Sequence, residues 1–388
     1  MSRVSEMALL PTGLRDVLPP DAAFEARVVE RLLARFASHG YQQVKPPLIE
    51  FEESLLSGAG AAMAAHTFRL MDPISQRMMG LRADITPQVA RIAATRLRKS
   101  PRPLRLCYAG QALRVKGSQL RPERQVGQAG VELIGAATTE ADAEVILLAA
   151  EALRAVGVAN LTVDLTLPTL VPALASDLGL DGETMDSLVT ALDRKDAPAV
   201  EALAGVQAPR FVTLMRAAGP ARRAIAALEA LDLPGSAAAE RARLAEVVEL
   251  VLSAMPDLNL TIDPVEHRGF EYHTGVSFTL FARRVRGELG RGGRYLSGDS
   301  ESSTGFTLYM DTVLRALPPP PPVRRVFVPS GTPRAVAARL RDQGWVTVAD
   351  LDRRDTDLRA EARRQACSHL LVDGEPREVG SGKERERP

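Results

Sequence analysis

Two stretches decide the fold: PLRLCYAGQALRV at residues 103–115 and RQVGQAGVELIG at residues 124–135. Both resemble β-strands, because apolar residues recur along each of them. Gly117 and Pro122 lie between them and favour a loop. The pattern therefore predicts an antiparallel strand pair joined by a long loop.

Amphipathic helices are predicted on both sides of this pair. Residues 21–39 carry apolar side chains at spacings of three and four, and Gly40 ends the helix. A second helix begins near Pro87, with Thr86 as its N-cap. Residues 139–156, rich in Ala and Leu, form a third.

The remaining segments complete an α+β pattern over residues 1–316. Residues 41–51, YQQVKPPLIEF, indicate an extended strand whose prolines suit a sheet edge or a subunit boundary. Residues 170–255 are rich in Ala, Leu and charged residues, which predicts a mostly helical insertion. Residues 310–317 return to helix, and further strands are expected at LTVDLTL, LNLTIDP, VSFTLFARRV and TGFTLYM. Antiparallel strands beside separate helical runs indicate an α+β core.

A run of five consecutive prolines within LPPPPPV, residues 317–323, marks a stiff linker. Residues 324–379 then alternate strand and helix patterns, which predicts a small α/β module with a parallel sheet. Residues 380–388, GSGKERERP, are expected to form a disordered tail.

Composition excludes several classes of protein. The chain has 49 Lys+Arg against 48 Asp+Glu, so its net charge gives no sign of a protein that coats nucleic acid. Two cysteines exclude a disulfide framework and a Cys-rich zinc site. The sequence shows neither a signal peptide nor an apolar span long enough for a membrane. A cytoplasmic protein without metal or cofactor is expected.

Several common catalytic motifs are absent from the sequence: G-x-x-x-x-G-K-[ST], H-E-x-x-H and G-x-S-x-G. The stretch GELGRGGR at residues 287–294 has four glycines and two arginines. Taken alone, it is better explained as a hairpin turn than as a loop that approaches phosphate.

Four segments, in order, resemble the catalytic core of class II histidyl-tRNA synthetases: GLRDVLPP at 13–20, LRADITPQVAR at 81–91, residues 113–135, and RGFEYHTG at 268–275. GGRY at 292–295 matches a further signature of that family, and the strand with Pro47 resembles its dimer-forming motif 1. The resemblance covers roughly residues 9–315. It implies a class II synthetase-like core, with an antiparallel sheet flanked by helices and a helical insertion.

The residue types in these segments suit a pocket for a free amino acid. Carboxylates, an amide and a hydroxyl accept hydrogen bonds from ammonium and ring N–H groups, an arginine pairs with a carboxylate, and aromatic side chains wall an imidazole. Each residue alone is better explained as a solvated polar group, but together they keep the family's spacing. The resemblance implies no catalytic residue and a histidine-like ligand site of Asp84, Thr86, Arg114, Gln128, Glu132, Arg268, Tyr272, His273 and Tyr295.

The nucleotide half departs from the family pattern. Lys116 stands where the family's motif 2 has glutamate. Motif 3 reads GFTLYMDTV, which places Tyr309, Asp311 and Thr312 where Gly, Glu and Arg belong. A threonine hydroxyl cannot replace a planar guanidinium that stacks on ATP. The C-terminal module is also shorter than the family's anticodon-binding domain.

This combination resembles the regulatory subunits of ATP phosphoribosyltransferase, which are synthetase paralogues without aminoacylation activity. The resemblance implies a short-form catalytic subunit as partner, a self-dimer within a hetero-octamer, and free histidine as a ligand, with no tRNA. It also implies a role in the first step of histidine biosynthesis and its feedback inhibition. Two alternatives stay open: a divergent histidyl-tRNA synthetase or related amino-acid ligase, and a non-catalytic tRNA-binding module.

Overall fold

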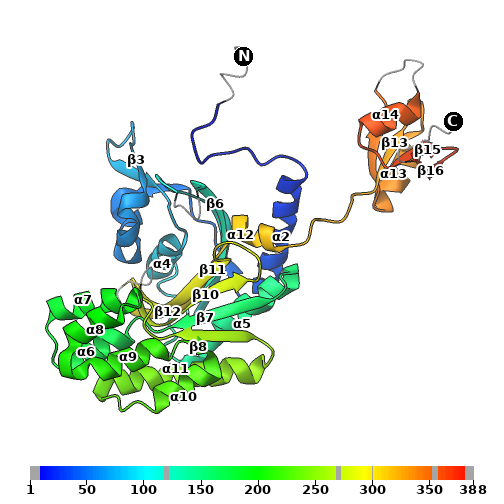
Figure 1. Cartoon of the computed structure of the whole chain (residues 1–388). Coiled ribbons are helices and arrows are strands. Elements are labelled where there is room, and N and C mark those ends of the chain that lie inside the picture. Colours follow the sequence, from blue (N-terminus) through cyan, green and yellow to red (C-terminus); the bar gives the residue numbers. More distant parts are fainter. Residues whose placement is uncertain (1–8, 118–121, 268–271, 299, 352–356, 381–388) are drawn as a thin grey trace. The chain divides into compact units, whose positions relative to one another are not determined.

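The computed structural model describes residues 9–117, 122–267, 272–298, 300–351 and 357–380. The chain divides into two compact units, Met1–Pro318 and Pro319–Pro388, and the division falls within the proline run (Figure 1). In the predicted tail, residues 381–388 lie outside the described residues. No helix in the described ranges is both long and apolar enough to cross a membrane.

A nine-stranded sheet forms the centre of the larger unit, counted over its described residues. Neighbouring strands are antiparallel except for the β1–β5 and β7–β9 pairs, which are parallel. The predicted antiparallel pair is confirmed as β5 and β6. The order across the sheet is β1 (Gln42–Gln43), β5 (Leu104–Leu113), β6 (Gln125–Ile134), β12 (Glu301–Tyr309), β11 (Gly290–Ser297), β10 (His273–Ala282), β7 (Leu161–Thr166), β9 (Asn259–Asp263) and β8 (Gly219–Pro220).

Helices cover both faces of this sheet. The helices α2 (Asp21–Ser38) and α5 (Thr139–Val156) contact each other and the sheet, and they share one apolar core with Cys107. The helix α4 (Thr86–Thr95) belongs to a separate apolar cluster with Leu106 and Tyr108. Successive side chains of a strand point to opposite faces. Therefore α4 lies on the face of the sheet opposite α2 and α5.

The extended segment at residues 41–51 was predicted as one strand, and that prediction is wrong. It divides into β1, at the edge of the large sheet, and β2 (Ile49–Phe51), which joins β4 (Met78–Leu81) and β3 (Phe68–Met71) in a second sheet. Proline has no amide hydrogen to donate to a ladder, so Pro46 and Pro47 separate the two strands. The short helices α3 (Glu52–Leu55) and η1 (Gly58–His66) follow.

Residues 170–255 are mostly helical, as predicted. Figure 1 shows these helices gathered beside the end of the sheet that carries β7, β9 and β8. The insertion consists of α6 (Leu170–Asp177), α7 (Gly182–Asp193), α8 (Ala197–Ala204), η2 (Gly205–Gln207), α9 (Ala208–Arg216), α10 (Ala221–Glu229) and α11 (Gly235–Ala254). The helix α12 (Met310–Ala316) follows β12 and ends the larger unit before the prolines.

The stretch GELGRGGR is only partly the hairpin turn that was expected from its glycines, because just residues 287–289 lie in the turn. Residues 290–297 form β11, a central strand of the sheet. A Cβ atom on Gly292 would lie 2.3 Å from the carbonyl oxygen of Gly305, and one on Gly290 would lie 2.4 Å from that of Thr307. These glycines therefore allow β11 and β12 to approach closely, while the turn itself occupies residues 283–289.

The second unit contains a four-stranded sheet in its described residues, in the order β14-β13-β15-β16. The parallel strands β13 (Arg325–Val328), β14 (Val346–Ala349) and β15 (His369–Val372) alternate with α13 (Arg334–Asp342) and α14 (Leu358–Arg364), as predicted. The antiparallel strand β16 (Glu375–Glu378) was not predicted, because its sequence EPRE has no strand pattern. Asp373 and Gly374, both with positive φ, form its turn.

A buried ionic group joins the insertion to the sheet. Asp142 of α5 is 2% exposed and accepts a hydrogen bond from Arg294 Nε of β11 at 3.1 Å. Arg243 Nη2 of α11 lies 3.2 Å from the same carboxylate. Arg294 is itself 4% exposed, so its charge depends on Asp142 for compensation.

We expect Asp142→Ala to lower the free energy of unfolding by about 3–5 kcal/mol, because it leaves the Arg294 guanidinium buried without its counter-ion. Urea denaturation followed by circular dichroism measures this. The matched control is Asp257→Ala, which removes an exposed ion pair with Arg154 and is expected to cost at most about 1 kcal/mol. Equal losses in the two variants would contradict the structural role given to Asp142.

Candidate functional site

Two adjoining cavities open beside the sheet in the described part of the chain. The outer cavity has a volume of about 420 Å³ and the inner one about 30 Å³. Because they share five residues, they form one continuous site. The shared residues are Asp84, Thr86, Tyr272, Arg291 and Tyr309.

Small residues make room for the polar groups of the inner cavity. A Cβ atom on Gly305 of β12 would lie 2.0 Å from Glu132 Oε2, and one on Gly130 would lie 2.5 Å from the Tyr108 hydroxyl. The pairing of β12 with β6 places Gly305 directly opposite Glu132. Glycine at these positions is therefore what allows a carboxylate and a phenol to lie within the sheet layer.

Glu132 is the most deeply buried acid of the site, with 1% of its surface exposed. The hydroxyl of Tyr295 donates to Oε2 at 2.8 Å, and that of Tyr108 donates to Oε1 at 3.4 Å. Burial raises the pKa of the Glu132 carboxyl to about 8 despite these hydrogen bonds. The group therefore holds a proton at neutral pH and can ionise when a cationic or N–H donor ligand enters.

Asp84 and Gln128 organise the start of α4. Gln128 Nε2 donates to Asp84 Oδ2 at 3.2 Å, and Gln128 Oε1 accepts from the Ile85 amide at 3.1 Å. Asp84 Oδ1 accepts from the Thr86 amide at 2.9 Å. The prediction that Thr86 caps the helix is therefore wrong, since α4 begins at Thr86 and its N-cap is Ile85.

The side chain of Thr86 instead faces the site. Its hydroxyl lies 3.1 Å from that of Tyr108 and 3.4 Å from that of Thr307. The hydroxyls of Tyr108 and Thr307 are 2.7 Å apart. These three hydroxyls continue the polar surface from Asp84 down to Glu132.

Aromatic rings form another wall of the site. The rings of Tyr272 and His273 have centroids 4.0 Å apart, and those of Tyr272 and Tyr295 are 6.3 Å apart. His273 is 6% exposed, whereas Tyr272 is 37% exposed and borders both cavities. Flat rings in this arrangement suit a planar ligand group.

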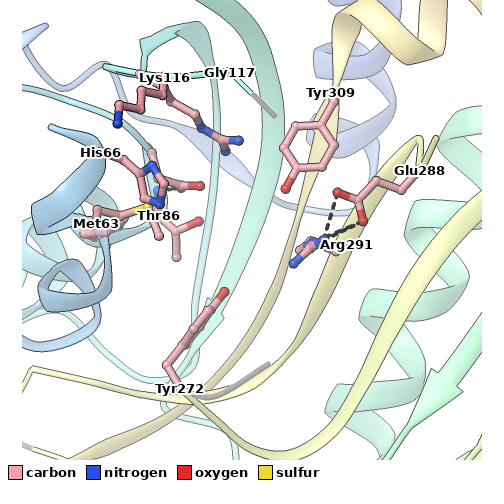
Figure 2. A pocket seen from close by; sticks show the side chains of 12 residues that line it. Met63, His66, Thr86, Lys116, Gly117, Tyr272, Glu288, Arg291 and Tyr309 are labelled. Carbon is pink, nitrogen blue, oxygen red and sulfur yellow. Dashed lines mark hydrogen bonds and ion pairs between the residues drawn. The ribbon is translucent and has the colours of Figure 1, made fainter. Parts of the chain in front are cut away.

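The outer cavity is lined by charges of both signs. Figure 2 shows Met63, His66 and Thr86 on one side, with Tyr309, Glu288 and Arg291 opposite. Arg291 and Glu288 form an ion pair at 2.7 Å. Arg114 and Lys116 add two further cations to the lining of the cavity.

Comparisons with known proteins show the family to which this chain belongs. The model described as "Histidyl-tRNA synthetase" matches residues 13–313. A relative from Rhodospirillum centenum, named "ATP phosphoribosyltransferase regulatory subunit", is 64% identical over 96% of this chain and 97% of its own. The chain belongs to the ATP phosphoribosyltransferase regulatory subunits, within the histidyl-tRNA synthetase family.

Two solved structures agree with this regulatory-subunit fold. An "ATP phosphoribosyltransferase regulatory subunit/histidyl-tRNA synthetase" from Bacillus halodurans superimposes with a TM-score of 0.79, at 25% identity, over 92% of this chain and 96% of that one. A chain of the ATP phosphoribosyl transferase complex from Thermotoga maritima gives 0.59, at 19% identity, over 74% of this chain and 97% of that one. The second likeness bears on the fold alone.

In this member of the regulatory-subunit family, most residues of the predicted ligand site line the cavities. Gln128 lines neither, because it is buried behind Asp84 and positions that carboxylate. Arg268 lies outside the described residues. The residues that line the cavities are Asp84, Thr86, Arg114, Glu132, Tyr272, His273 and Tyr295.

Of the four residues that depart from the synthetase pattern, two line the outer cavity and two do not. Lys116 and Tyr309 line the outer cavity. Thr312, by contrast, is fully buried on α12, and Asp311 forms an ion pair with Arg315 at 3.6 Å. Neither is among the residues that line the two cavities.

Several site residues were not predicted from the sequence. Glu288 and Arg291 were hidden by the turn interpretation of GELGRGGR, although alternating Gly and Arg could have indicated a strand crossing a polar site. Met63 and His66 come from η1, whose sequence gives no signal of a binding role. In the described ranges, no group of three or more His, Cys, Asp or Glu side chains is arranged to hold a metal ion.

We expect the free energy of unfolding of the wild type, relative to Glu132→Gln, to fall as pH rises between about 5 and 8. Burial raises the pKa of Glu132 in the folded protein to about 8, above its ordinary value of 4.5. Its contribution is therefore complete below the unfolded pKa and is lost as pH rises through the folded one, by on the order of 1 kcal/mol per pH unit. Urea denaturation of both proteins across this range measures the difference. A difference independent of pH would show that Glu132 is not buried as described.

Proposed function

We propose that the chain acts as the regulatory subunit of ATP phosphoribosyltransferase in histidine biosynthesis. It would work with a short catalytic subunit that condenses ATP with phosphoribosyl pyrophosphate, and it would make that reaction sensitive to histidine. The observation that carries the proposal is the 64% identity to a regulatory subunit over nearly the full length of both chains. As part of a soluble biosynthetic enzyme, it would work in the cytoplasm.

The two cavities together support histidine as the ligand. Free histidine offers N–H groups on its imidazole and its ammonium, and both need acceptors. Glu132 lies at the base of the site and Asp84 nearer the outer cavity, so one ligand can meet a carboxyl group at each end. Tyr272 and Tyr295 flank the space between them. The histidine carboxylate is left for the cations of the outer wall, with Arg114 the nearest match in geometry to a carboxylate.

The outer cavity argues against amino-acid activation. Stabilising a triphosphate in flight requires preorganised positive groups. Here the carboxylate of Glu288 pairs with Arg291, and the ring of Tyr309 occupies the same wall. The pairing engages the guanidinium of Arg291, and the ring of Tyr309 adds bulk to the cavity. We propose that the chain forms no histidyl-adenylate.

We also propose a self-dimer within a hetero-octamer of regulatory and catalytic chains. The small sheet carries exposed apolar side chains on neighbouring strands, including Ile49 at 37%, Met71 at 63% and Met78 at 42%. Exposed apolar groups on adjacent strands favour burial against another chain. Together with the edge strand β1, they support a subunit contact in this region. Binding of tRNA is not part of the proposal.

The proposed function is tested with the purified chain and its short-form catalytic subunit. We expect the two to copurify, and phosphoribosyl-ATP formation by the mixture to be inhibited by histidine. Glu132→Gln should raise the histidine concentration for half-inhibition by about tenfold or more, because glutamine cannot ionise when the ligand enters. Inhibition is measured against each variant's own uninhibited rate. Inhibition that is equally sensitive in the variant would place histidine elsewhere.

The alternative, a divergent synthetase or amino-acid ligase, is favoured by the retained Arg114. We expect the purified chain to show no histidine-dependent exchange of pyrophosphate into ATP, and an authentic histidyl-tRNA synthetase provides the positive control. Exchange above the level without histidine would establish adenylate formation and reverse the assignment. The substitution Tyr309→Gly restores the glycine of the synthetase pattern and enlarges the outer cavity. It shows whether the bulk of the tyrosine side chain alone prevents adenylate formation.

A further inference from the structure

The helical insertion contacts the chain segment that leads into the pocket. The strands β7 and β9 are parallel neighbours, so their carboxyl ends lie side by side. From the end of β9 the chain continues through residues 263–267, which we call the entry segment, towards Tyr272 and His273 of the site. The corner between α7 and α8 contacts this segment directly.

Two residues of that corner make the contacts. Asp193, the last residue of α7, accepts a hydrogen bond from the His267 amide at 3.2 Å. Lys195 Nζ donates to both carboxylate oxygens of Asp263, at 2.7 and 2.6 Å. The two contacts hold the two ends of the entry segment. From the sheet side, the Thr166 hydroxyl donates to the Glu266 carbonyl at 2.6 Å.

The same contacts bring carboxylates together. The side chain of Glu266 lies near Asp164 of β7, Asp263 of β9 and Asp193 of α7, and Lys195 is the cation that faces it. Burial, followed by these three carboxylates, raises the pKa of Glu266 to about 7. Asp164 is bound in turn by the Thr261 hydroxyl at 2.6 Å. We call this group of four carboxylates and Lys195 the junction. Near neutral pH, the charge of Glu266 within it is therefore sensitive to small changes in its surroundings.

We propose that Asp193 and Lys195 are positioning residues, which hold the entry segment and thereby set how tightly the pocket binds histidine. The proposal rests on the histidine-binding function proposed above. In this proposal the helical insertion changes the histidine affinity of the pocket indirectly, because none of its residues lines either cavity. A partner chain that shifts the α7–α8 corner would change histidine affinity, and bound histidine would change the affinity for that partner by the same factor.

Calorimetric titration of histidine into the full chain tests the proposal. Asp193→Ala removes the acceptor of the His267 amide and is expected to weaken binding roughly threefold to tenfold. Asp193→Asn keeps an acceptor oxygen and should stay within about twofold of the wild type. The matched control is Asp186→Ala, which changes an exposed aspartate of the same helix and should have no effect. Lys195→Ala tests the second contact, should Asp193→Ala not fold.

A pH series distinguishes positioning from a general loss of stability. Below pH 7 Glu266 is protonated, and above it the ionised group repels Asp164, Asp193 and Asp263. The ratio of the wild-type Kd to that of Glu266→Gln should therefore rise from near one at pH 6 to severalfold at pH 8. The glutamine variant serves as the reference because both proteins share every other titrating group, including those of histidine itself.

The outcomes separate this inference from the proposed function. If the wild type binds no histidine, the proposed function fails and the inference fails with it. If the wild type binds histidine but Asp193→Ala and Lys195→Ala, shown to be folded by thermal unfolding, bind it equally well, only the inference is overturned. A Kd ratio that does not change with pH would also overturn the role given to the junction.

Discussion

The burial of one carboxyl group, that of Glu132, constrains the rest of the site. A carboxyl with 1% exposure costs several kcal/mol if it is charged and unpaired, so the surrounding sheet must supply donors or let it keep its proton. Tyr108 and Tyr295 supply the donors. Gly130 leaves space for the ring of Tyr108, and Gly305 leaves space for the carboxylate of Glu132 itself. The single carboxyl group of Glu132 thus constrains the identity of these four residues, which lie on four strands.

The sheet separates this polar chemistry from the main core. Along β6, Val131 and Leu133 belong to the apolar core shared with α2 and α5, while Glu132 between them faces the site. The alternation of side chains along a strand fixes both functions at once. A slip of one residue in the pairing of β6 with β12 would place Glu132 in the apolar core. The register of the sheet therefore fixes the positions of the pocket residues on these strands.

The strands and helices of the site could be predicted from local patterns, whereas its side walls could not. The pair β5–β6 and the helix α5 follow from residue periodicity and turn signals. The place of Arg291, and of Glu288 in the turn just before it, depends on β11 lying between β10 and β12, a long-range pairing that the glycine-rich sequence conceals. The start of α4 was wrongly predicted for a related reason: the amides there are bound by Asp84, just before the helix, and by Gln128 on the distant strand β6. Local capping rules do not include such a distant partner.

A pocket that binds an amino acid serves catalysis and regulation under different physical conditions. Catalysis requires interactions that strengthen in the transition state. In the function proposed above, the pairing of Arg291 with Glu288 and the bulk of Tyr309 work against such interactions around a phosphate, and Arg114 and Lys116 are left to bind the ligand. Regulation requires only that the ligand bind two states of the protein unequally. The sheet floor around Glu132 is fixed by its register, so the difference must come from walls that can move. Tyr272 precedes β10 and follows a segment tied to the helical insertion by two side chains. Under the positioning role proposed above, it is therefore the part of the pocket best placed to differ between states.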